Sequence, residues 1–395
     1  MSLVANLRTI RAPVMAFLAM GVFWGAWHAL IPRVKFDAGA SDAALGSALL
    51  CVAVGAIPAM MLGGQLVGRL GPWLLPASIA LFGIAAMLPT LADDPIELGA
   101  ALLVVGAASG FMDIMGNVRV SELESREKAG FMHLAHGLFS AAYLFAALST
   151  GLARSIGIGP TAILGAVAAI MLAQAVCAVT RPPSPLRDPE PEVPAGRILS
   201  LPVVLFGGIV FAAFLAENGL QSWSALHLER SLAAAPTIDA LGPAAIGLAS
   251  FVGRVGGHFL TARIGEYAII IASALVATVA VAIFATSSAI MPALAALFVA
   301  AAGISIIAPS AIGMAGRAAA PAKRGSAVAT VSVMGYTGFF VGPAMLGFVA
   351  EHFGITIALG TVALILAAVM PLSLAAKRSA ASDRGAGSSC QYDHN

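Results

Sequence analysis

The sequence predicts an all-α membrane protein with twelve transmembrane helices in two six-helix halves. Three observations carry this prediction: 59% of the 395 residues are hydrophobic, only 10% are charged, and the apolar residues fall in long runs. Soluble domains carry about 25% charged residues, and a soluble fold cannot hide this much apolar surface. Runs of about 20 residues that are apolar on every side indicate helices, because barrel strands would alternate polar and apolar residues.

The apolar runs also divide the chain. The sixth and seventh runs are separated by a charged, proline-rich segment, Arg181–Arg197, which cannot span a membrane and reads as a cytoplasmic linker. We therefore predict an N-terminal half (1–180), a linker (181–200), a C-terminal half (201–376) and a disordered cytoplasmic tail (377–395). The predicted spans are 12–32, 44–66, 74–92, 97–118, 131–153, 159–180, 201–226, 238–261, 267–286, 289–313, 326–349 and 355–375.

The basic residues predict the orientation of the spans. With the N-terminus inside, all but four of the 21 Lys and Arg residues fall in cytoplasmic segments, and the exceptions are Arg33, Lys35, Arg154 and Arg230. Basic segments stay on the cytoplasmic side of a membrane, and an even number of spans returns the chain to that side. We therefore expect a multi-pass inner-membrane (plasma-membrane) protein with both termini in the cytoplasm. The first run is too long for a cleaved signal peptide.

Several functional classes lack support in the sequence. The net charge of +2 gives no reason to expect nucleic-acid binding. The three cysteines, Cys51, Cys177 and Cys390, lie far apart and have no metal-ligand spacing. No phosphate-binding loop and no catalytic motif is present. We therefore predict that the protein is not an enzyme and uses no metal or cofactor.

The segment after the second predicted span resembles the major facilitator superfamily of transporters. The family's loop motif is matched here by Gly64, Arg69 and Gly71. The sequence departs from it at Gly68, where the family has aspartate, and at Pro72–Trp73, where the family has a basic pair. The resemblance extends over about residues 12–375 and implies two six-helix halves that rock about a central site.

A second stretch, Gly110–Ser140, is more specific. It resembles the fucose-permease-like branch of that family, in its YbjJ-like bacterial subgroup. The subgroup resemblance implies a bacterial inner-membrane location and sugars or sugar-like polar solutes as substrates. The residues that match the subgroup in order are Asp113, Asn117, Glu122 or Glu124, His136 and Ser140.

Ionisable residues inside the spans are the candidates for proton coupling, because each costs about 2.5–3.5 kcal/mol at the bilayer centre. Asp113 and His136 lie at similar depth on neighbouring spans, so we expect them to pair, either as a proton-coupling pair or as a structural pair. Glu217 in the seventh span is the third candidate. Its alternative is an interfacial carboxylate in contact with water.

The predicted substrate-binding residues are aromatic and amide side chains on the same spans: Trp24, His28, Asn117, Asn218, Gln221 and Tyr336. Aromatic faces stack on sugar rings, although tryptophan also favours membrane interfaces. The predicted gating residues are Arg69 and Arg254. Arg254 either pairs with Asp113 or extends its charge to the lipid headgroups.

These residues favour a secondary active transporter of a small polar solute, such as a sugar, a polyol or an amino-inositol, that works as a proton symporter by alternating access. The expected partners are the solute, protons and the lipid bilayer, and the expected state is a monomer. One alternative is a multidrug or metabolite exporter. A second is a non-transporting membrane sensor or scaffold, and the short linker and tail disfavour it.

Overall fold

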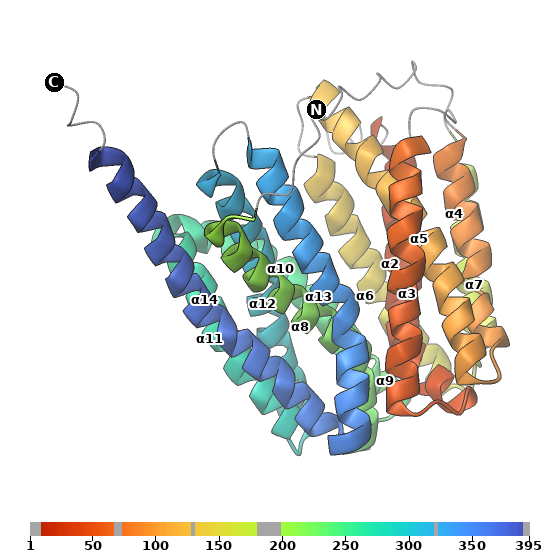
Figure 1. Ribbon diagram of the computed structural model, residues 1–395. Coiled ribbons are helices and arrows are strands. Elements are labelled where there is room, and N and C mark those ends of the chain that lie inside the picture. Colours follow the sequence, from red (N-terminus) through yellow and green to blue (C-terminus); the bar gives the residue numbers. More distant parts are fainter. Residues whose placement is uncertain (1–8, 67–72, 128–130, 180–198, 320–322, 390–395) are drawn as a thin grey trace. The chain divides into compact units, whose positions relative to one another are not determined.

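The computed structural model describes residues 9–66, 73–127, 131–179, 199–319 and 323–389, and all regular structure in these ranges is helical (Figure 1). Within them, 12 segments are long and apolar enough to cross a membrane, which confirms the predicted fold class. The first six are α2 (Arg11–Asp37), α3 (Asp42–Leu66), α4 (Leu74–Ala85) with η1 (Leu88–Leu91), α5 (Pro95–Glu127), α6 (Phe131–Ser155) and α7 (Pro160–Ala178). The others are α8 (Leu201–Leu232), α9 (Pro236–Asp239) with α10 (Leu241–Ile264), α11 (Glu266–Thr286), α12 (Ile290–Ala318), α13 (Arg324–Phe353) and α14 (Ile355–Ser389).

The end of the chain differs from the expectation of a disordered tail from residue 377. Helix α14 continues to Ser389. The physical reason is that a helix already nucleated by its apolar span needs no new nucleus to extend, and the stretch 377–389 contains no proline to end it. Arg69 and residues 181–198 of the predicted linker lie outside the described ranges.

The chain forms two compact units. Unit 1 comprises Met1–Glu190, Gln221–Leu248 and Gly347–His352, and unit 2 comprises Pro191–Leu220, Ala249–Leu346 and Phe353–Asn395. Helices α8, α10 and α13 therefore each contribute residues to both units. The predicted boundaries at 180 and 201 stay predictions.

In unit 1, helix α2 packs against α6 and α7, and α3 packs against α5. Glycines make the closest approaches. A Cβ atom at Gly25 would clash with the carbonyl oxygen of Tyr143 on α6, and one at Gly55 would clash with that of Leu103 on α5. Helices in lipid associate through such close backbone packing, since no hydrophobic driving force acts between them.

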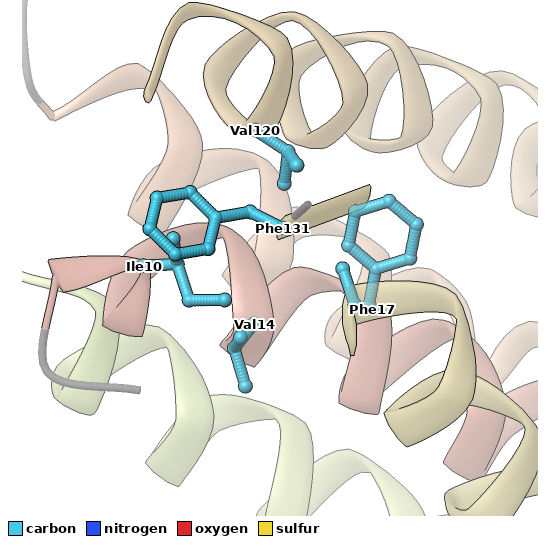
Figure 2. Close-up of a cluster of buried hydrophobic side chains, with 6 residues drawn as sticks. Ile10, Val14, Phe17, Val120 and Phe131 are labelled. Atoms are coloured by element: carbon cyan, nitrogen blue, oxygen red, sulfur yellow. The ribbon is translucent and has the colours of Figure 1, made fainter. Parts of the chain in front are cut away.

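A cluster of buried apolar side chains lies at the start of α2 (Figure 2). The cluster joins the start of α2 to the end of α5 and the start of α6. Partly buried hydrophobic residues, including Met15 and Leu123, pack around it. Its buried members are Ile10, Val14, Phe17, Val120, Phe131 and Ala135.

In unit 2, helix α11 packs against α12 and α14. Helix α8 packs closely against α13 at two glycines. A Cβ atom at Gly338 would clash with the carbonyl oxygen of Phe211, and one at Gly342 would lie 2.7 Å from that of Leu215. Both helices of this contact carry predicted site residues.

Candidate functional site

Asp113 and Asn117 form a polar pair on α5. The Asn117 side-chain nitrogen donates a hydrogen bond to Asp113 Oδ1 at 2.9 Å and a second to the Asp113 carbonyl oxygen at 2.9 Å. Both side chains are half-buried. No ion pair links Asp113 to a cation within the ranges that the structure describes. The carboxylate therefore lies in a membrane-spanning helix with an amide partner and no described counter-charge.

His136 lies on α6, the helix that follows. Its ring packs edge-on against Phe17 of α2, with 4.9 Å between the ring centroids. The residue as a whole is exposed. Asp113 is thus hydrogen-bonded to Asn117, and His136 packs edge-on against Phe17. The proton-coupling partnership of Asp113 and His136 stays a prediction.

An aromatic and imidazole cluster connects α2 to α6. His28 Nδ1 and the Tyr143 hydroxyl are 2.8 Å apart in a buried hydrogen bond, and the half-buried Trp24 ring stacks on the His28 ring at 5.7 Å. The sequence analysis found Trp24 and His28 but missed Tyr143. The signal for Tyr143 was its position seven residues after His136, which places both on one helical face. We refer to Trp24, His28 and Tyr143 as the α2–α6 cluster.

Glu217 and Arg254 form an ion pair in unit 2. An Arg254 terminal nitrogen lies 3.1 Å from Glu217 Oε1, and the Glu217 side chain is 12% exposed while that of Arg254 is 42% exposed. The two roles considered from the sequence, pairing with Asp113 and reaching the headgroups, stay predictions. Within unit 2, Arg254 is paired with a carboxylate on α8.

The remaining predicted residues lie near α8. The Asn218 side-chain nitrogen donates to the carbonyl oxygen of Phe339 at 2.7 Å, which ties α8 to α13. Tyr336 of α13 is 44% exposed, and its ring lies 5.7 Å from that of Phe214. Gln221 is half-buried in the part of α8 that belongs to unit 1. Asn218 and Tyr336 thus share the α8–α13 contact.

Unit 1 also contains a group of charges whose pairing the sequence analysis did not predict. Lys35 Nζ lies 3.1 Å from Asp42 Oδ1, and an Arg230 terminal nitrogen lies 2.7 Å from the same oxygen. The backbone N–H of Asp42 donates to Glu351 Oε2 at 2.8 Å. These four residues, the Asp42 cluster, come from α2, α3, α8 and α13, so the cluster connects helices that are distant in sequence.

A second ion pair in unit 1 is almost fully enclosed. An Arg154 terminal nitrogen lies 2.6 Å from Asp239 Oδ1, with the side chains 7% and 0% exposed. The same nitrogen donates to the carbonyl oxygen of Ala29 at 2.8 Å. The pair therefore joins α6, α9 and α2.

The four basic residues that broke the orientation pattern now have a common explanation. Arg33 pairs with Asp37 at 2.9 Å, and Lys35, Arg154 and Arg230 are paired as described above. Each of them is paired with a carboxylate, which explains their places on the outer side in the predicted orientation.

Comparison with known families decides the identity of the chain. The model of the Major Facilitator Superfamily matches residues 14–304. This chain belongs to the major facilitator superfamily. An uncharacterized MFS-type transporter of Yersinia pestis is 29% identical over 372 residues, covering 92% of this chain and 94% of the relative. Membrane protein MosC of Rhizobium meliloti is 28% identical over 362 residues, covering 88% of this chain and 85% of MosC.

Solved structures of two transporters share the fold. A bacterial homologue of the human lysosomal transporter Spinster, in an inward-facing and occupied conformation, has a TM-score of 0.76 at 16% identity, covering 96% of this chain and 98% of its own. The nucleoside transporter NupG has a TM-score of 0.71 at 16% identity, covering 94% and 98%. The protein is therefore a multi-pass membrane protein of a transporter family, and small-molecule solutes are its expected cargo.

Proposed function

We propose that this major facilitator protein is a secondary active transporter that couples a small polar solute to protons. The observation that carries the proposal is the Asp113 carboxylate, half-buried in a spanning helix with only an amide bonded to it among the described residues. An uncompensated charge in a membrane helix is costly and marks an ion or proton pathway. Protonation of Asp113 removes that charge. We propose that the protonated and the ionised carboxyl favour different conformations of the transporter.

The α2–α6 cluster favours a polar solute that contains a ring as the substrate. The indole face of Trp24 gives a planar surface, and the buried His28–Tyr143 hydrogen bond lies beside it. Binding sites of this kind combine apolar and aromatic walls with a few placed polar groups. Sugars, polyols and amino-inositols have that chemistry, and the resemblance to the fucose-permease-like branch, in its YbjJ-like subgroup, points to the same class.

The Glu217–Arg254 pair supplies a second protonation site in this proposal. While Arg254 is paired with Glu217, its positive charge favours the ionised form of the carboxylate. Movement of α10 away from α8 would separate the two side chains and leave Glu217 free to bind a proton. His136, with its ring on Phe17, is proposed as the relay on α6.

In this proposal, the Asp42 cluster and the Arg154–Asp239 pair keep the transporter closed on one side during alternating access. By the loop-charge pattern, these groups lie on the outer side of a bacterial inner membrane, with both termini in the cytoplasm. We propose that they hold the outer ends of α2, α3, α6, α8, α9 and α13 together. Opening to the outside requires these pairs to separate and become hydrated.

Ligand stabilisation of the purified protein tests the solute class. We expect at least one member of a panel of L-fucose, D-glucose, myo-inositol, an amino-inositol and uridine to raise the thermal unfolding midpoint, because a ligand that binds only the folded state stabilises it. Uridine is included because NupG, which shares the fold, is a nucleoside transporter. The Trp24→Ala variant is expected to lose the shift.

Trp73→Ala is the matched control, since Trp73 is 64% exposed at the start of α4. This variant should keep the full ligand response. Stabilisation by hydrophobic cations such as ethidium, with no response to any polar solute, would instead favour the multidrug exporter.

A further inference from the structure

Unit 2 contains a groove that is lined by none of the predicted transport residues. It lies among α10, α11 and α12 and has a volume of about 560 Å³, within the roughly 300–1,000 Å³ range of ligand sites. Its walls are almost wholly apolar. Its lining includes Gly256, Phe259, Leu260, Val276, Phe298 and Val299.

Of three glycines of α10 that line the groove, two are closely packed against α12 and one faces open space. A Cβ atom at Gly253 would clash with the carbonyl oxygen of Ala302 on α12, and one at Gly257 would lie 2.8 Å from the Ile306 side chain. Close packing thus explains these two glycines. At Gly256, which also lines the groove, a Cβ atom would meet nothing within 4 Å.

A basic residue lies at one end of the groove. Arg263 lines it and is exposed near the end of α10, seven residues after Gly256 and so about 10 Å along the helix. Glu266, the first residue of α11, is the neighbouring carboxylate in sequence, but it is already paired with Arg317 of α12. No carboxylate within the described ranges is paired with Arg263.

We propose that this groove binds one anionic phospholipid, with an acyl chain along Gly256 and the phosphate on Arg263. An apolar channel beside an uncompensated cation is complementary to a lipid of that kind. By the loop-charge pattern the end of α10 faces the cytoplasmic leaflet, where basic groups recognise anionic headgroups. The inference rests on the membrane-spanning fold and on the predicted orientation of α10, and it is independent of the transported solute.

Native mass spectrometry of the full-length protein in detergent tests this site. Phosphatidylglycerol and phosphatidylethanolamine with the same acyl chains are added, and the retained lipid is counted. The wild type is expected to retain one phosphatidylglycerol in preference to phosphatidylethanolamine. Arg263→Gln should weaken phosphatidylglycerol retention about fivefold, since one basic group near an anionic headgroup has an effect of that size. Gly256→Leu, which fills the groove, should reduce retention of both lipids.

Gly64→Leu is the matched control, because Gly64 is also an exposed helical glycine with nothing within 4 Å of a Cβ atom. It should retain phosphatidylglycerol as the wild type does. Equal retention of phosphatidylglycerol by the wild type and Arg263→Gln would overturn the proposal. So would a change from dimer to monomer in Gly256→Leu, because the groove would then be a contact between two copies of the chain.

Discussion

Replacing either partner of the Arg154–Asp239 pair with leucine is expected to destabilise the protein by about 3–5 kcal/mol, because each change leaves one buried charge without its partner. The side chains are 7% and 0% exposed, so water cannot take the missing partner's place. Asp239 Oδ2 already lacks a hydrogen-bond partner among the described residues, which leaves Asp239 especially dependent on Arg154. The thermal unfolding midpoint of purified protein in detergent measures the effect.

Two comparisons make this expectation specific. The double variant Arg154→Leu with Asp239→Leu should recover much of the lost stability, since replacing both charges removes the desolvation cost. Arg33→Leu is the surface control, because the Arg33–Asp37 pair has side chains 54% and 37% exposed and such pairs contribute about 0–1 kcal/mol. Single variants that unfold no earlier than Arg33→Leu would show that the buried pair does not hold α2, α6 and α9 together.

Gly25→Val is expected to disrupt the contact between α2 and α6. A Cβ atom at this position would clash with the carbonyl oxygen of Tyr143, and a backbone group cannot move aside as a flexible side chain does. Overpacking typically costs about 1–3 kcal/mol, and the rigid backbone places this site at the upper end. The two helices must separate, which breaks the His28–Tyr143 hydrogen bond. Yield of monodisperse protein and its unfolding midpoint report the loss.

The control for Gly25→Val is Gly360→Val on α14, where nothing lies within 4 Å of a Cβ atom. It makes the same residue change in a helix without the clash. A Gly25→Val protein as stable as Gly360→Val would mean that α2 and α6 are not in backbone contact.

The fold was predictable because membrane helices are set by composition and length. In lipid, the backbone polar groups of a long apolar run must be hydrogen-bonded within the run, and a helix achieves this. All twelve predicted spans accordingly overlap helices of the structure. The helix ends were less predictable. Helix α5, for example, runs to Glu127, past the predicted end at residue 118, since polar residues continue a helix that its apolar part has started.

The partners within the site were much less predictable. Local pairs such as Asp113 with Asn117 follow from the four-residue spacing on one helix. The pairing of Asp42 with Arg230 and that of Arg154 with Asp239 depend on how distant helices pack, and no local pattern encodes it. The loop-charge count identified Arg33, Lys35, Arg154 and Arg230 as exceptions, and that was the signal for paired charges.

Proton movement in proteoliposomes tests the proposed coupling most directly. Vesicles loaded with a pH-sensitive dye and carrying the wild-type protein receive each solute of the polar panel, in labelled form. A transported solute is expected to change the lumenal pH as it enters. With Asp113→Asn the same solute should still exchange across the membrane while the pH stays constant. Solute entry into wild-type vesicles with no change in pH, or ethidium transport with no polar solute moved, would contradict the account.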